Sequence, residues 1–215
     1  MKALKTIIIA FITVLLLLSS CKKTDNGTPV TTPDTTEPIS IGTEVKDKDE
    51  WLKIFSSESY KNVTFEIESI LEEGSFYSKI MLDGDKAKAA EKIESAELFD
   101  EKAKYYRIEE NTYKLWDPES SSWKDSYDSD ESGREMVIGA VYDDNVLLYA
   151  RDYYDNYVYD SEKQAYVWTQ QNGSFEFCIK DGKCIKMVFK SGDLSIVTNL
   201  TDYGNTVVTY PENVK

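Results

Sequence analysis

The chain has 215 residues, of which 39 are acidic and 25 basic, giving a formal net charge of −14. Phosphate backbones repel such an acidic surface, which argues against nucleic-acid binding. The sequence contains no histidine, which excludes Ser-His and Cys-His catalysis and removes the commonest zinc ligand.

The amino terminus has the pattern of an export signal. Lys2 and Lys5 precede an uncharged run, residues 6–18, and two serines and Cys21 follow it. This order is typical of a secretory signal peptide. A run of thirteen residues is too short to cross a bilayer, which takes about 20, and so argues against an uncleaved anchor helix. The segment Leu18-Ser19-Ser20-Cys21 resembles the lipobox of bacterial lipoproteins, which implies cleavage before Cys21 and acyl chains, such as palmitate, on that cysteine.

Cleavage would divide the chain into a signal peptide (1–20), a tether (21–43) and one domain (44–215). Loss of Lys2 and Lys5 with the leader would lower the net charge from −14 to −16. We expect the mature protein in the bacterial cell envelope, facing outside the cytoplasm, with a membrane contact through lipid on Cys21. Two or more acyl chains give lasting attachment, whereas one does not.

The tether contains three of the five prolines, many threonines and almost no large apolar residue. Such a segment cannot bury enough surface to offset its ordering entropy. The domain should then open with a helix over about 47–56. Asp47 or Asp49 can cap it, and Trp51, Ile54 and Phe55 share one face at helical spacing.

The rest of the domain alternates with a period of two. Apolar residues of one parity are Val63, Phe65, Ile67; Phe76, Ile80, Leu82; Tyr106, Ile108; Tyr113, Leu115; Tyr166, Trp168; Phe175, Phe177, Ile179; Ile185, Met187, Phe189; Leu194, Ile196, Leu200; and finally Val207. Turns are predicted at Asp83-Gly84, Asn172-Gly173, Asp181-Gly182, Ser191-Gly192 and Tyr203-Gly204. Short alternating strands joined by glycine-containing turns predict an antiparallel meander with one buried face.

One interruption has helical spacing. Within residues 132–154, Val137 and Val141 are four residues apart, and Leu147, Leu148, Arg151 and Tyr154 then give further spacings of three and four. The predicted fold class is therefore mainly β (α+β): a single curved antiparallel sheet, or half-open β-barrel, with one or two packed helices.

This layout resembles the LolA-like lipoprotein fold. The shared features are a helix after the tether, a long meander, a central helical insertion and a final strand pair. The local likeness is greatest from Asp193-Leu194-Ser195-Ile196 through residues 202–208 to Pro211. The resemblance implies a hydrophobic cavity between sheet and helices, which relatives use to hold a lipid or acyl chain.

Three groups of side chains are candidate sites, each with a simpler interpretation. Asp125, Asp128, Asp130 and Glu131 could offer oxygen ligands to calcium, but Gly133 comes too late for a calcium loop, and a solvated loop is the simpler explanation. Lys180, Lys183, Lys186 and Lys190 could form a basic strip, or could protect strands against edge association. Tyr153, Tyr154, Tyr157, Tyr159, Tyr166 and Trp168 could stack on a glycan, or could simply pack.

Cys178 and Cys184 are predicted to form a cross-strand disulfide, which an exported domain permits. A three-residue loop, Lys180-Asp181-Gly182, would pair Ile179 with Lys183 and keep six apolar side chains on one face. It would also set Glu176 opposite Lys186 and the two cysteines opposite each other.

No nucleophile elbow, phosphate loop or metal-ligand cysteine pair is present, although a carboxylate pair would need no histidine. The sequence therefore predicts a monomeric, non-catalytic, membrane-tethered protein without cofactor or metal. It would bind a lipid or another hydrophobic or amphiphilic ligand in a half-barrel cavity. The alternative is a surface interaction module that contacts a protein or glycan through exposed aromatic residues.

Overall fold

The computed structural model describes residues 42–71, 74–93, 103–109, 112–125 and 150–214. In these ranges it has one short α-helix, α2 (Lys48–Ile54), two 3₁₀ turns, η2 (Ser57–Tyr60) and η5 (Tyr154–Asn156), and a single 11-stranded sheet. The strands are β1 (Asn62–Leu71), β2 (Gly74–Asp83), β3 (Lys86–Ile93), β4 (Lys104–Glu109), β5 (Thr112–Asp117), β6 (Ser122–Asp125), β7 (Val158–Asp160), β8 (Ala165–Gln170), β9 (Gly173–Lys180), β10 (Lys183–Ser191) and β11 (Leu194–Thr201). The predicted mainly β fold class is confirmed.

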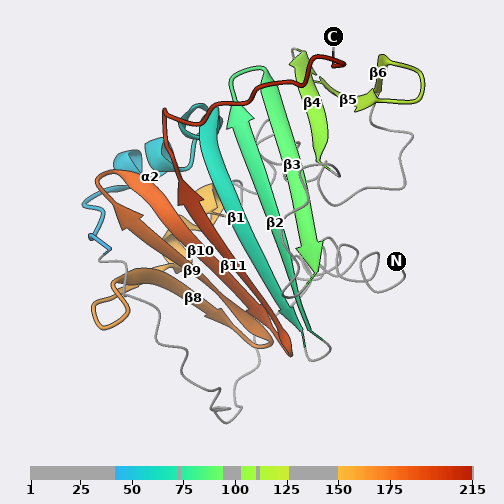
Figure 1. Ribbon diagram of the computed structural model, residues 1–215. Coiled ribbons are helices and arrows are strands. Elements are labelled where there is room, and N and C mark those ends of the chain that lie inside the picture. Colours follow the sequence, from blue (N-terminus) through green and yellow to red (C-terminus); the bar gives the residue numbers. More distant parts are fainter. Residues whose placement is uncertain (1–41, 72–73, 94–102, 110–111, 126–149, 215) are drawn as a thin grey trace.

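The sheet consists of two antiparallel meanders. Its strand order is β6-β5-β4-β3-β2-β1-β11-β10-β9-β8-β7, so each strand except β1 and β11 pairs only with neighbours in the sequence. The pairing of β1 with β11 joins the two halves at the centre. Figure 1 shows the sheet as an open, strongly twisted layer with α2 on its far side. Its edges, β6 and β7, are short, as is typical of edges that must not pair with other chains.

Alternation along the strands gives the sheet an apolar and a polar face. The apolar face combines residues that lie opposite one another in the strand register: Val63, Phe65, Ile67, Ile80, Leu82, Ala87, Ala89, Tyr106, Leu115, Tyr166, Trp168, Phe175, Phe177, Ile179, Met187, Phe189, Ile196 and Leu200. The predicted parity therefore holds for these residues. The intervening residues form the polar face.

Helix α2 packs on the apolar face, as the sequence predicts for residues 47–56. Asp47 caps the helix, since its Oδ1 accepts a hydrogen bond of 2.8 Å from the Glu50 amide. Trp51 and Phe55 are fully buried. The Trp51 ring lies 4.8 Å from that of Tyr166, and its Nε1 donates to the Ala150 carbonyl at 2.6 Å. Trp51 thus ties the helix to the sheet and to the segment before β7.

The folded domain begins at least two residues before the predicted boundary at 44. The Thr43 amide donates to the Ile179 carbonyl at 2.6 Å, and the Tyr159 hydroxyl donates to the Gly42 carbonyl at 3.2 Å. Gly42 fits because it has no side chain: a Cβ there would lie 1.8 Å from the Gln164 carbonyl oxygen. This close approach fixes where the chain joins the domain.

The β9–β10 hairpin differs from the predicted register. Its loop has two residues, Asp181 and Gly182, both with positive φ, and Ile179 pairs with Cys184. Sequence reasoning rejects that loop because it would place the apolar residues of the two strands on opposite faces. A bulge between Cys184 and Lys186 removes the conflict, since one extra residue restores the parity.

The predicted disulfide between Cys178 and Cys184 is wrong. It depended on a three-residue loop, which the hairpin does not have. Cys184 lies opposite Ile179 on the apolar face, and Cys178 lies opposite Lys186 on the polar face. The two residues are buried thiols. Glu176 likewise lies opposite Val188 instead of Lys186.

The predicted strand at Val207 is also wrong. After β11, residues 202–214 form no strand, and Val207 is 67% exposed. This segment crosses the ends of the central strands toward β4, as Figure 1 shows. The Asn62 side chain bonds both the amide and the carbonyl of Thr206, and the Val208 amide donates to Asp83. These backbone groups of Thr206 and Val208 therefore bond to side chains of the strands and not to the backbone of a paired strand.

Several predictions fall outside the described residues: the signal peptide, Cys21, the tether up to residue 41, and residues 132–149 of the central helix. Residues 150–152 are helical and lead into η5. Within the described ranges, no helix has the length and hydropathy needed to span a membrane.

Candidate ligand-binding face

Four aromatic side chains form a continuous row across β8, β9 and β10. Tyr153 stacks on Trp168 with ring centroids 5.0 Å apart, and Trp168 stacks on Phe175 at 5.8 Å. Phe175 contacts Phe189 at 4.9 Å. The register explains the row, because Trp168 lies opposite Phe175 and Phe175 opposite Phe189. We call Tyr153, Trp168, Phe175 and Phe189 the aromatic row.

The aromatic row borders the densest part of the core but is less buried than it. Phe177 lies two residues from Phe175 on the same strand, contacts both Trp51 and Phe55 and is 6% exposed. Trp168 and Phe175 are only half-buried, and Tyr153 is 38% exposed. Within the row, Tyr153, Trp168 and Phe175 are therefore the more accessible members, whereas Phe189 is 8% exposed.

Aliphatic side chains extend the row toward the centre of the sheet. Phe189 packs with Leu194 and Ile196, and half-buried Ile67 and Leu71 pack against these three. Ile67 also contacts the main core. The result is a contiguous apolar surface from β8 to β1, half-buried at Trp168 and Phe175 and buried at Phe189.

Two tyrosines beside the row differ in how their hydroxyl groups are satisfied. The Tyr166 hydroxyl accepts from the Val45 amide at 2.8 Å and donates to the Val45 carbonyl at 2.9 Å. The Tyr157 hydroxyl is buried and has no hydrogen-bond partner. Burial raises the pKa of both phenols above the usual value, so both stay protonated at neutral pH.

The structure brings together the six aromatic residues that the sequence singled out, but mostly as packing. Tyr154, Tyr157 and Tyr166 each contact the Trp51 ring within 5.4 Å, and Tyr159 packs on Tyr166 at 5.2 Å. Among the six, only Tyr153 is a largely exposed hydrophobic residue. Trp51, Phe175 and Phe189 complete the cluster. Sequence reasoning had assigned these three to separate elements, and only the register joins them.

The other predicted sites are dispersed. Asp125 ends β6 opposite Lys114, and the remaining calcium candidates lie outside the described residues. The described ranges hold no group of three or more potential metal-ligating side chains. Lys180 lies opposite Lys183 at the hairpin turn, and the register places Lys186 and Lys190 on the same, polar, face of β10.

The two thiols have no features of a reactive site. Cys184 belongs to the core and is 1% exposed. Cys178 donates to the Gln164 carbonyl at 3.6 Å beneath Gly42. Burial raises the pKa of both thiols above the usual value, so little nucleophilic thiolate forms at neutral pH.

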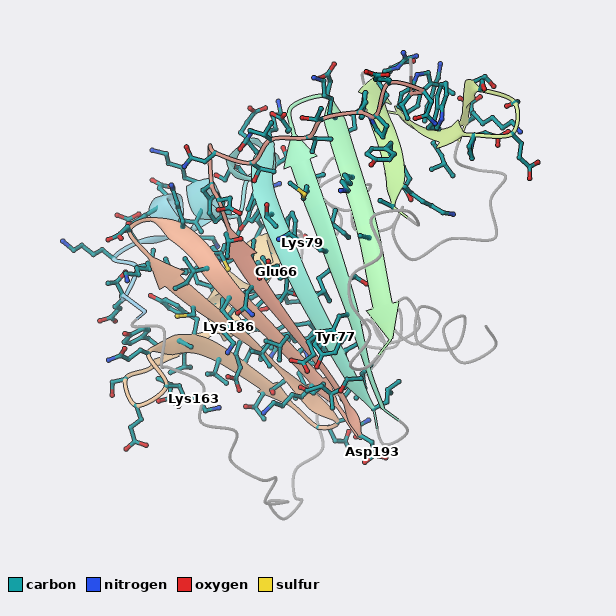
Figure 2. The ribbon with its side chains drawn as sticks, viewed as in Figure 1. Glu66, Tyr77, Lys79, Lys163, Lys186 and Asp193 are labelled. Atoms are coloured by element: carbon teal, nitrogen blue, oxygen red, sulfur yellow. The ribbon has the colours of Figure 1, made fainter. Side chains whose placement is uncertain are left out.

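The polar face carries paired charges across the centre of the sheet. Glu66 and Lys79 form a 2.9 Å ion pair, the Tyr77 hydroxyl donates to Glu68 at 2.6 Å, and Lys163 bonds Glu176 at 2.8 Å. Figure 2 looks onto this face and shows Glu66 and Lys79 on the neighbouring strands β1 and β2, with Lys186 on β10 beyond β11. Such alternating, half-exposed charges suit a surface that faces water.

A second aromatic cluster lies on the polar face of β4–β6 and was missed by sequence reasoning. Trp123 contacts Trp116 at 5.3 Å and Tyr210 at 5.4 Å, and Tyr210 contacts Tyr105 at 6.0 Å. The Arg107 guanidinium lies 5.0 Å from the Trp123 ring. A sequence signal for it is the position of the two tryptophans on either side of the Pro118 turn, where the hairpin sets them opposite each other. We call Tyr105, Trp116, Trp123 and Tyr210 the polar-face aromatic cluster.

No protein-family model matches the sequence, and no curated protein matches it. Among solved structures, the chain is similar to LprF from Mycobacterium bovis, with 8% identity and a TM-score of 0.36 over 78% of this chain and 97% of that chain. A likeness this distant carries no argument about function, which we derive from the residues of this chain alone. The chain itself is a mainly β protein built on one large antiparallel sheet.

Proposed function

We propose that the protein is a membrane-tethered lipoprotein of the bacterial cell envelope that binds a hydrophobic or amphiphilic ligand without catalysing a reaction. The apolar run before Cys21 supports export and lipidation. The acidic surface supports a domain that stays soluble and away from anionic lipid, so that only the tether reaches the membrane.

The proposal for a ligand rests on the half-buried members of the aromatic row, Trp168 and Phe175. Large apolar side chains gain about 25 cal/mol for each Å² removed from water, so a sheet that leaves Trp168 and Phe175 only half-buried retains surface that an apolar ligand could cover. Tyr153, Trp168 and Phe175 also present stacked rings, which are rigid and lose little entropy when an aliphatic chain packs on them. The ligand would lie along the apolar face beside α2.

Quenching of tryptophan fluorescence by a brominated alkane tests this function. The protein would be the mature chain with Cys21→Ser, so that no detergent competes for the probe. Binding on the apolar face should quench Trp168 saturably, and Trp168→Phe should remove most of the quenching. Trp123→Phe, on the polar face, is the matched control and should leave the quenched signal intact. Unsaturable quenching that is equal in both variants would refute the proposal.

The anchor has its own test. The wild-type chain should incorporate labelled fatty acid and partition into detergent, and Cys21→Ala should lose both properties and keep its leader. Fatty-acid labelling that survives this substitution would contradict the anchor and leave the ligand proposal untouched.

A second candidate function is contact with a glycan or protein through the polar-face aromatic cluster. One observation favours it: the Lys86 and Arg107 cations lie within 5.8 Å of the Tyr210 and Trp123 rings, so this surface combines aromatic and cationic side chains. Trp123→Ala should then abolish pull-down of the protein by insoluble cell-wall polysaccharide but preserve alkane binding. Pull-down that is unaffected by Trp123→Ala would exclude this surface.

A further inference from the structure

The Tyr157 hydroxyl is a buried polar group in an apolar environment. The Tyr157 side chain is 7% exposed, and its ring lies 5.1 Å from Phe177, 5.4 Å from Trp51 and 5.6 Å from Trp168. No hydrogen-bond partner reaches its oxygen. Buried polar groups in native proteins are nearly always paired, and an exception calls for an explanation.

Packing does not account for this hydroxyl. Phenylalanine has almost the same shape without the unpaired group, and this face already uses it at Phe175 and Phe177. The neighbouring Tyr166, at a similar depth, makes two hydrogen bonds to Val45, whereas the Tyr60 hydroxyl, elsewhere in the core, also has no partner among the described residues. Tyr157 is therefore built differently from its neighbour, and folding alone gains nothing from its oxygen.

The position of Tyr157 suggests what its hydroxyl would bind. Tyr157 meets Trp168 nearly edge-on, with 75° between the rings, so it stands at the inner end of the aromatic row. A ligand that covers Trp168 would lie beside the Tyr157 ring, and its acceptor would reach the enclosed hydroxyl by entering the packing around it. Because burial keeps the phenol protonated, the group it offers is a neutral hydrogen-bond donor.

We propose that Tyr157 is a specificity-determining residue that recognises an uncharged hydrogen-bond acceptor, such as an ester or ketone carbonyl, on an otherwise apolar ligand. This inference rests on the proposed function. The three rings around Tyr157 carry no charge, and burial of an ionised carboxylate among them without a counter-charge would be costly. A neutral carbonyl supplies the missing acceptor without that penalty.

The test compares two brominated probes of equal length, an alkane and an acyl methyl ester, by quenching in the Cys21→Ser mature chain. One net hydrogen bond corresponds to a preference of roughly fivefold, so the wild type should bind the ester about that much more tightly than the alkane. Tyr157→Phe should abolish the preference and leave alkane affinity unchanged. The variant should melt no lower than wild type, because it removes an unpaired hydroxyl, whereas the matched control Tyr166→Phe should melt lower.

Each outcome separates the two proposals. If the alkane binds and the ester preference is absent, or persists in Tyr157→Phe, the role of Tyr157 is refuted and the ligand-binding function stands. If Tyr157→Phe lowers the melting temperature as Tyr166→Phe does, the hydroxyl has a structural partner and the inference also fails. Saturable binding of neither probe overturns the proposed function, and this inference with it.

Discussion

Replacement of Trp51 by alanine should test how the sheet and helix are held together. Trp51 is fully buried and contacts Phe55, Tyr157, Tyr166 and Phe177. Truncation of a buried tryptophan typically costs about 3–5 kcal/mol. Loss of the indole donor also leaves the Ala150 carbonyl unpaired, which adds about 1 kcal/mol or more. Single domains are stable by only about 5–15 kcal/mol, so Trp51→Ala should lose much of the total.

Urea denaturation monitored by circular dichroism measures the loss in free energy of unfolding. In a thermal melt, a domain of this size should lose on the order of 10 °C or more in Tm. Trp51→Phe should fall between wild type and alanine, since it keeps most of the ring contacts but loses the hydrogen bond. Tyr153→Ala, an exposed member of the aromatic row, is the control and should cost far less. A loss below about 1 kcal/mol for Trp51→Ala would show that α2 does not close the core.

The remaining predictions concern the thiols, the carboxyl-terminal segment and one hairpin. Cys178 and Cys184 should both be alkylated after unfolding without reductant and react slowly in the native protein; a mass that shows a disulfide would contradict the register. Asn62→Ala should lower stability by about 1–3 kcal/mol in urea titrations, because the Thr206 carbonyl loses its donor and the Thr206 amide keeps only its bond to the Asp202 carbonyl; an unchanged midpoint would mean that the segment is not held there. In the β5–β6 hairpin, hydrogen bonds from Lys124 and Ser120 lower the pKa of Asp117. The contribution of Asp117 to stability is therefore present above about pH 4 and is lost as pH falls through the lower folded-state pKa. Asp117→Asn should therefore be less stable than wild type at neutral pH, with a difference that shrinks in acid; a difference independent of pH would refute this assignment.

The sequence predicted the features that depend on local periodicity. A period of two places residues such as Phe65, Ile80 and Leu200 on one face wherever strands are long and antiparallel. The capping Asp47 and the spacing of Trp51, Ile54 and Phe55 likewise define α2 without any tertiary information.

The errors arose where long-range contacts decide. The two-residue loop at Asp181-Gly182 looked incompatible with burial because a bulge near Ile185 leaves no local signal in the sequence. Val207 continues the apolar alternation, but side chains of Asn62 and Asp83 occupy the backbone bonds that a strand would need. These partners lie more than a hundred residues away in the chain.

The candidate site was only partly predictable for the same reason. The sequence grouped Trp168 with the nearby tyrosines, but Phe175 and Phe189 join Trp168 only through the register of three strands. The difference between Tyr157 and Tyr166 could not be predicted at all. It depends on where the Val45 backbone passes, and nothing near either tyrosine in the sequence indicates that position.

Native mass spectrometry of the mature protein purified from the membranes of its own host tests the central claim most directly. We predict a mass above that of the polypeptide with its Cys21-linked acyl chains, with the excess released as an uncharged apolar molecule on extraction with organic solvent. The spectrum of Trp168→Ala, prepared in parallel, should show a smaller bound fraction. A wild-type mass that equals the acylated polypeptide alone, with no extractable ligand, would contradict the claim that the apolar face binds one.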